Sequence, residues 1–121
     1  MKDNNIVQEK SYQFALRIVK LYSYLQKEKK EFALSKQILR SGTSIGANIE
    51  EGIGAQSKKD FLSKFSIAYK EARETLYWLR LLTDSGFMSA KEFKSLSTDC
   101  EELLKIIGAI QTTIKRKYLE K

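Results

Sequence analysis

The sequence predicts an all-α protein, an antiparallel up-down-up-down four-helix bundle that forms a single domain over residues 1–121. Three observations predict this fold class. Apolar residues recur at three- and four-residue spacing along four segments, the chain contains no proline, and no segment alternates apolar and polar residues as strands do. Because the connections between these segments are short, consecutive helices are expected to run antiparallel.

The first helix is expected over residues 6–27, with its apolar side chains on one face. That stripe consists of Phe14, Ile18, Leu21, Tyr22 and Leu25, with Ala15 and Val19 beside it. The charged run at residues 27–31 interrupts the pattern, which indicates the first connection.

The second helix is expected over residues 36–51, with Ser35 as its N-cap. Leu34 before that cap and Leu39 inside the helix have the spacing of a hydrophobic staple. The apolar stripe of this helix consists of Ile38, Gly42, Ile45, Ile49 and Ile53. The helix is expected to end at two glycines, Gly52 and Gly54.

The third helix is expected to begin at Ser57, with Asp60 at the reciprocal position of a capping box, and to end at residues 84–86. Its stripe consists of Phe61, Phe65, Ala68, Ala72, Leu76 and Leu79. The capping residues and the apolar spacing therefore both predict a helix between residues 57 and 86.

The fourth helix is expected to begin with the capping box of Ser89 and Glu92, flanked by Met88 and Phe93 as a staple. Its stripe alternates spacings of four and three, as in a packed bundle or coiled coil. The stripe consists of Leu96, Cys100, Leu103, Ile107, Ile110 and Ile114.

Small residues are concentrated between Ser41 and Gly52, within the second helix. Each glycine costs a helix about 1 kcal/mol relative to alanine, so close packing or a ligand must compensate at Gly42 and Gly46. Flanking small residues widen this face, namely Ser41, Ser44 and Ala47. The face meets either a helix of the same chain or a neighbouring subunit.

The residue types exclude several kinds of enzyme. The chain has no histidine, so it lacks a Ser-His-Asp triad, a Cys-His pair and the Glu-x-x-His motif of di-iron bundles. A single cysteine, Cys100, excludes an intrachain disulfide, argues against zinc and is expected in the core. The glycine-rich stretch lacks the Gly-Lys-Ser/Thr of a phosphate-binding loop. No cofactor, metal or catalytic residue is therefore predicted.

Carboxylates are the remaining chemical candidates. Glu71 and Glu74 share one face of the third helix, and Arg73 and Arg80 lie near them in sequence. An ion-pair layer is expected in preference to an acid/base pair. The other candidate carboxylates are Glu50, Glu51, Glu101 and Glu102.

The formal net charge of +7 permits an acidic partner such as RNA or DNA. In this topology the termini and the second connection lie at one end of the bundle, which gathers seven positive and three negative charges. These residues are Lys2, Asp3, Lys58, Lys59, Asp60, Lys115, Arg116, Lys117, Glu120 and Lys121. The candidate nucleic-acid-binding residues are Lys58, Lys59, Lys115, Arg116 and Lys117; a solvated helix end is the alternative.

The chain also has more aromatic residues than one core stripe requires, and these suit either a subunit contact or base stacking. They are Tyr12, Tyr24, Tyr69, Tyr77 and Trp78. No run of about 18 apolar residues and no signal-peptide pattern is present, so a cytoplasmic location is expected.

Three stretches carry a family resemblance: Gln37-Ile38-Leu39-Arg40, the run from Ser44 to Gly52, and the run from Phe61 to Leu82 with its Lys70-Glu71-Ala72-Arg73-Glu74-Thr75-x-Tyr77-Trp78-Leu79 core. On these residues the chain resembles the 23S rRNA intervening-sequence proteins, a bacterial family. The resemblance covers nearly the whole chain.

The resemblance implies an antiparallel four-helix bundle that assembles into a ring, typically a pentamer. The fold is similar to that of the accessory protein of diversity-generating retroelements, a basic pentamer that binds a reverse transcriptase and nucleic acid. It implies no catalytic residue. The resemblance implies structural or interfacial roles for its signature positions, which are Arg40, Asn48, Glu51, Gly52, Glu71 and Glu74. The helix-packing or oligomer signature predicted on the second helix consists of Gly42, Ser44, Gly46, Asn48, Glu51 and Gly52.

Together, residues and resemblance favour a non-enzymatic homo-oligomer whose basic surface engages RNA or DNA. The first alternative is a protein-interaction adaptor with no direct nucleic-acid contact. The second is a small enzyme that uses a carboxylate cluster around Glu51, Glu71 and Glu74.

Overall fold

The four expected helices are all present in the computed structural model, which describes the backbone of residues 2–119 and the side chains of residues 4–117. They are α1 (Lys2–Lys27), α2 (Leu34–Ile53), α3 (Lys58–Asp84) and α4 (Ala90–Leu119). Four residues of the predicted basic end have side chains outside this description, namely Lys2, Asp3, Glu120 and Lys121.

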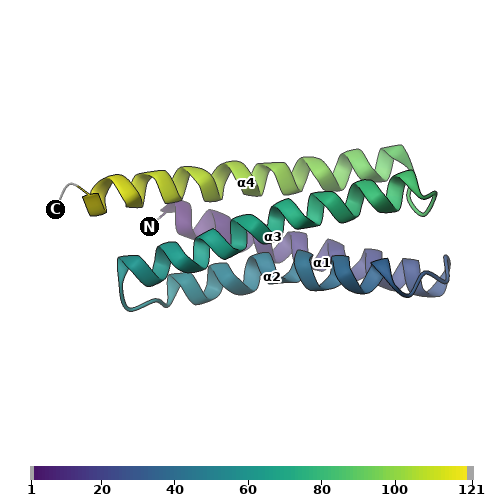
Figure 1. The fold of residues 1–121 in the computed structure, drawn as a ribbon, viewed down its shortest axis with the longest axis horizontal. Helices are drawn as coiled ribbons and strands as arrows, with labels where there is room; N and C mark the ends of the chain where they lie inside the picture. Colours follow the sequence, from purple (N-terminus) through teal and green to yellow (C-terminus); the bar gives the residue numbers. More distant parts are fainter. Residues whose placement is uncertain (1, 120–121) are drawn as a thin grey trace.

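The helices form an antiparallel bundle in which each helix packs against two neighbours (Figure 1). The neighbouring pairs are α1/α2, α2/α3, α3/α4 and α1/α4, and the last of these is the least extensive contact. Both chain ends and the α2–α3 connection lie at one end of the bundle (Figure 1). The predicted fold class and topology are confirmed.

Most residues of the predicted apolar stripes form the core, but Val19, expected beside the stripe of α1, is 47% exposed. Every stripe residue of α4 from Leu96 to Ile110 is buried, and Ile114 packs partly buried against them. The largest fully buried side chains come from all four helices and include Phe14, Ile18, Ile45, Phe65, Leu79 and Ile107. Ile53 departs from the predicted stripe of α2, because its side chain is 36% exposed.

The N-terminus of α2 differs from the prediction. The helix begins at Leu34, and Ser35 lies inside it, so Ser35 is not the N-cap. Instead, the Glu31 carboxylate accepts hydrogen bonds from the backbone N–H groups of Ala33 (3.1 Å), Leu34 (2.9 Å) and Ser35 (2.6 Å). The left-handed backbone of Lys30 (φ 53°) precedes this cap. A carboxylate outside the helix thus replaces the predicted serine cap.

Burial pushes the pKa of Glu31 upward, but the N–H groups of Leu34, Ser35 and Ala33 outweigh it and hold that pKa below its ordinary value. The ionised form of Glu31 is therefore the one that the folded chain favours. Leu34 and Leu39 both pack against the core, although Leu34 is the first helical residue and not the residue before a cap.

The C-terminus of α2 also extends past its prediction. Gly52 is buried inside the helix, and the C-cap is Gly54. A Cβ at Gly52 would lie 2.7 Å from the ring of Phe65 in α3. The absence of a side chain there lets α2 and α3 approach closely.

Both other predicted serine caps are present, but the reciprocal bond of the capping box is found only at the start of α4 and not between Ser57 and Asp60. Ser57 accepts a hydrogen bond from the backbone N–H of Asp60 at the start of α3. At the start of α4, Ser89 accepts from the N–H of Glu92 (3.1 Å), and the Glu92 carboxylate accepts from the N–H of Ser89 (3.3 Å). The second capping box is therefore reciprocal, as predicted.

Candidate nucleic-acid interface

The predicted carboxylates form an ion-pair layer, but with a different partner. Arg40 of α2 donates to Glu71 (3.1 Å) and to Glu74, both on α3. Neither Arg73 nor Arg80, the expected partners, takes part. Arg40 comes from a neighbouring helix, which spacing along α3 could not indicate.

Two further contacts complete this layer. The indole N–H of Trp78 donates to Glu74 (2.8 Å), and Lys64 of α3 pairs with Glu51 of α2 (2.9 Å). The hydrogen bond and charge of Glu51 raise the pKa of Lys64. All three carboxylates of the enzyme hypothesis, Glu51, Glu71 and Glu74, are thus engaged by cations, which favours a structural role for them.

Arg73 and Arg80 lie instead on the side of α3 that faces α4. Ser66 accepts a hydrogen bond from Gln111 of α4 (2.9 Å), so the side of α3 that carries Ser66 is the side that faces α4. Arg73 follows Ser66 by seven residues, close to two full turns, and Arg80 follows Arg73 by the same interval. Both guanidinium groups therefore lie along the α3/α4 side of the bundle.

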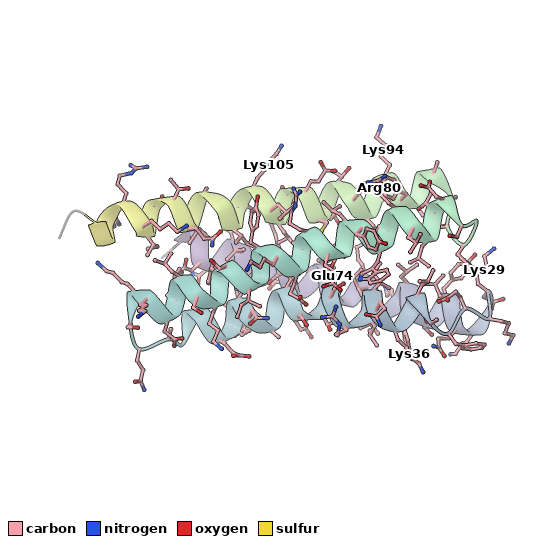
Figure 2. All side chains as sticks on the ribbon, in the orientation of Figure 1. Lys29, Lys36, Glu74, Arg80, Lys94 and Lys105 are labelled. Carbon is pink, nitrogen blue, oxygen red and sulfur yellow. The ribbon has the colours of Figure 1, made fainter. Side chains whose placement is uncertain are left out.

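The outer surface of α4 carries a row of cations beside Arg73 and Arg80. Lys94, Lys105 and Arg116 are exposed and recur every eleven residues, close to three full turns. Figure 2 shows Lys94 and Lys105 extending from α4 away from the bundle, with Arg80 nearby on α3. By helical rise the row spans about 33 Å.

We call the exposed cations on this side the basic face; they are Lys70, Arg73, Arg80, Lys94, Lys105, Lys115 and Arg116. Among the described residues, none of these seven side chains makes an ion pair or a hydrogen bond. Glu101 and Asp84 are the acidic side chains placed on the same side, which leaves a formal charge of +5. Most of the net charge of +7 is therefore on one face.

Ion pairs occur on other sides of the bundle. Lys10 pairs with Glu102 (3.2 Å) and Arg17 with Asp99 (2.6 Å), both between α1 and α4. The Arg40 and Lys64 pairs lie between α2 and α3. Carboxylates thus neutralise cations on those sides.

The predicted basic end overlaps only partly with the basic face. Lys115 and Arg116 belong to both, and exposed Lys59 and Lys117 lie at the same end of the bundle. Lys58 is half-buried and has interactions of its own within the chain. The face along α3 and α4 was not predicted, although the eleven-residue recurrence on α4 is visible in the sequence.

The small-residue signature is mainly a packing surface within the chain. A Cβ at Gly42 would lie 2.7 Å from Ile18 of α1, so that glycine serves the α1/α2 contact. Ser44 and Asn48 are half-buried, and each bonds to a backbone carbonyl one turn earlier in α2. Gly46 is less confined, because a Cβ added there would lie 3.4 Å from the Ser11 carbonyl oxygen.

The aromatic prediction needs a correction. Tyr12, Tyr24 and Tyr77 are exposed, whereas Tyr69 and Trp78 are half-buried against the core. Tyr69 packs near Gly108 of α4. Of the five aromatic residues predicted to be exposed, Tyr12, Tyr24 and Tyr77 are the ones that are.

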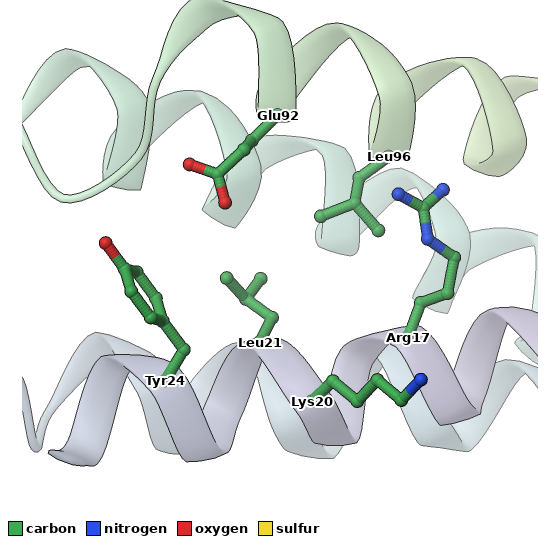
Figure 3. Close-up of a pocket in the computed structure, with 6 residues that line it drawn as sticks. All are labelled: Arg17, Lys20, Leu21, Tyr24, Glu92 and Leu96. Atoms are coloured by element: carbon green, nitrogen blue, oxygen red, sulfur yellow. The ribbon is translucent and has the colours of Figure 1, made fainter. Parts of the chain in front are cut away.

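An open cleft of about 380 Å³ lies between α1 and α4 (Figure 3). Leu21 and Leu96 form its floor, and charged and aromatic side chains surround it, namely Arg17, Lys20, Tyr24 and Glu92. Glu92 is already part of the α4 cap. Over the residues that the structure describes, no group of three potential metal-ligating side chains occurs.

Cys100 is buried, and its thiol donates to the carbonyl of Ala72 (3.3 Å). Burial, with the nearby charges of Glu101 and Asp99, raises the pKa of Cys100 to about 12. The predicted core position is confirmed.

The fold and this surface define the class of protein: an all-α, antiparallel four-helix bundle with a basic outer face. The family model for the 23S rRNA-intervening sequence protein matches residues 3–109, and the chain belongs to that family. The predicted resemblance is confirmed.

The chain is similar to a solved structure from Bacteroides thetaiotaomicron, a protein of unknown function from the S23 ribosomal protein family. The two are 50% identical, the match covers 91% of this chain and 98% of that one, and the TM-score is 0.90. A search of curated proteins finds no match. None of the helices in the described part of the chain has the length and apolarity that crossing a bilayer requires.

Proposed function

We propose that this protein is a non-enzymatic, cytoplasmic homo-oligomer that binds the phosphate backbone of RNA or DNA through its basic face. The observation that carries the proposal is the set of seven exposed cations that have no carboxylate partner among the side chains of residues 4–117. Cations that neutralise phosphates release condensed counterions, which favours binding at low salt. Paired cations, such as Arg17 and Arg40, would first have to give up a carboxylate.

Exposed apolar side chains on two sides of the bundle support assembly. On α1, Tyr12, Leu16 and Val19 are 60%, 42% and 47% exposed, beside a small groove of about 210 Å³ between α1 and α2. On the α2 side of α3, Ile67 is 41% exposed. Such surfaces on a small bundle are typical of interfaces.

Unlike surfaces that meet head to tail close into rings. These two lie on neighbouring sides of a four-sided bundle, about a quarter turn apart, which suits rings of about four or five subunits with parallel axes. The family resemblance favours a pentamer. Such a ring would leave the α3/α4 side, and therefore the basic face, directed outward.

Light scattering after gel filtration tests the assembly. We expect an oligomer for the wild type and a smaller species for Leu16→Glu, because a charge at this contact would be desolvated on association. Thr113→Glu, at an exposed position of α4, is the control and should keep the wild-type mass. A strictly monomeric wild type at high micromolar concentration would reject the oligomer.

Fluorescence anisotropy with labelled RNA and DNA at low salt tests the basic face. We expect Lys94→Glu/Lys105→Glu to weaken binding at least about tenfold and to flatten the salt dependence by about two units of slope for duplex DNA. Reversal at Lys115, Arg116 and Lys117 should also weaken binding. Lys29→Glu/Lys36→Glu makes the same charge change elsewhere on the bundle (Figure 2) and is the matched control.

Equal weakening by the two charge-matched pairs would show a general charge effect and reject the face. Absence of RNA and DNA binding at low salt would reject nucleic-acid binding altogether.

The second candidate function is a protein-interaction adaptor. It is favoured by Phe32 and Tyr24, which are 53% and 37% exposed near the α1–α2 connection, away from the predicted basic end. A specific protein partner that persists after nuclease treatment would support the adaptor over direct nucleic-acid binding.

A further inference from the structure

Within the basic face, one exposed tyrosine lies among cations on α3. Lys70, Arg73, Tyr77 and Arg80 are spaced by three, four and three residues, so they form one continuous stripe along the helix. The Tyr77 side chain is 56% exposed. Arg73 and Arg80 lie about one turn to either side of it, and neither makes an ion pair in the described part of the chain.

Side chains between α2 and α3 hold the ring of Tyr77 in place. It meets the ring of Trp78 edge to face, with centroids 4.9 Å apart and planes at 73°. Trp78 in turn donates to Glu74, and Glu74 is held by Arg40 of α2. A chain of specific contacts therefore limits the orientations of an otherwise exposed ring.

The same contacts reduce the competing negative charge near Tyr77. Glu71 and Glu74 are the carboxylates nearest to Tyr77 along α3, and both are directed to Arg40. Arg40 thus offsets one of their two negative charges and holds both carboxylates on the α2 side of the helix. Arg73 and Arg80 remain available to an incoming anion.

The other exposed tyrosines lack this setting. Tyr12 lines the α1/α2 groove together with Glu50, and Tyr24 already has Lys29 over its ring, 5.9 Å from the centroid. Among the exposed tyrosines of residues 4–117, Tyr77 alone lies between two guanidinium groups without partners.

We propose that the α3 stripe binds single-stranded nucleic acid, with an unpaired base stacked on Tyr77 and the flanking phosphates bound by Arg73 and Arg80. This inference rests on the proposed nucleic-acid binding and adds the strandedness of the ligand. A duplex keeps its bases stacked on each other and offers phosphates alone, whereas a single strand offers both a base face and phosphates. The α3 stripe supplies the Tyr77 ring for the base and the two guanidinium groups for the phosphates.

The test measures binding of fluorescein-labelled 20-nucleotide single-stranded RNA and of the corresponding 20-base-pair duplex to the full chain. Tyr77→Ala should weaken single-strand binding about tenfold and duplex binding less than about twofold, because stacking is lost and the cations remain. Tyr77→Trp should restore single-strand binding. Tyr24→Ala, at the other exposed tyrosine near the α1–α2 connection, is the matched control and should change neither affinity.

A charge variant provides the second readout. Arg73→Gln/Arg80→Gln should weaken single-strand binding and reduce the slope of its salt dependence by about 1.4, the value for two lost phosphate contacts. Gel filtration with light scattering should give the same mass for every variant.

The outcomes separate the two proposals. Wild-type protein that binds both nucleic acids, with equal losses for Tyr77→Ala on each, would overturn the single-strand site and leave the basic face intact. A reduced oligomer mass for Tyr77→Ala would also overturn it, since Tyr77 would then be a subunit contact. Wild-type protein that binds neither nucleic acid would overturn both proposals.

Discussion

Two glycines one turn apart in α2 should respond oppositely to the same added methyl group. A Cβ at Gly42 would lie 2.7 and 2.9 Å from two carbons of Ile18, a β-branched and fully buried side chain that has little freedom to move. At Gly46 the nearest atom would be 3.4 Å away, which is an ordinary contact. Gly42→Ala should therefore destabilise the bundle and Gly46→Ala should stabilise it.

The magnitudes follow from two opposing terms. Alanine gains about 1 kcal/mol of helix propensity at either site. Overpacking a filled core costs about 1–3 kcal/mol, and the short distances at Gly42 place it in the upper part of that range. We expect a net loss of about 1–2 kcal/mol for Gly42→Ala and a net gain of about 0.5–1 kcal/mol for Gly46→Ala.

Urea unfolding followed by far-ultraviolet circular dichroism measures both free energies of unfolding. Protein concentration must be the same throughout, because association would add to the apparent stability. If Gly42→Ala were as stable as Gly46→Ala, the α1/α2 approach would not be limited at Ile18, and the packing argument would be refuted.

Three further predictions concern single groups. Because its pKa is lowered in the folded chain, Glu31 should contribute stability above its unfolded pKa of about 4.5 and lose that contribution as pH falls through the folded value. Urea midpoints should therefore fall more for the wild type than for Glu31→Ala between about pH 6 and 3, and parallel curves would contradict the cap. Arg40→Ala should alter the emission of the single tryptophan, Trp78, by releasing Glu74, while an unchanged spectrum would show that Glu74 holds the indole without Arg40. Cys100 should react with a thiol reagent only slowly at neutral pH and rapidly in denaturant, because its pKa is about 12 and it is buried; rapid labelling of the native protein would disagree.

The sequence predicts most of the fold because the signals for helices are local. The stripes on α3 and α4, the serine caps of both helices and the core position of Cys100 depend on spacings of three or four residues. The start of α2 does not follow from such spacing. Its cap is Glu31, which reaches forward from the preceding connection after the left-handed turn at Lys30.

The site depends more strongly on tertiary structure. Glu71 and Glu74 are identified as an ion-pair layer from their spacing, yet their partner, Arg40, is more than 30 residues away in the chain. Arg73 and Arg80 become available as a result. The basic face also requires α3 and α4 to lie side by side, so its cations cannot be counted together until the topology is known.

The contact between α1 and α4 has a consequence for how the chain folds and opens. It joins the two ends of the sequence, and it is the least extensive of the four helix pairs. The ion pairs across it, Lys10–Glu102 and Arg17–Asp99, have side chains that are 40–52% exposed and so stabilise it only weakly. Contacts between distant parts of a chain are slow to form, and weakly stabilised ones open at low free-energy cost. We therefore expect the contact between α1 and α4 to form late in folding. The backbone amides of α1 and α4 should exchange with solvent faster as the salt concentration increases.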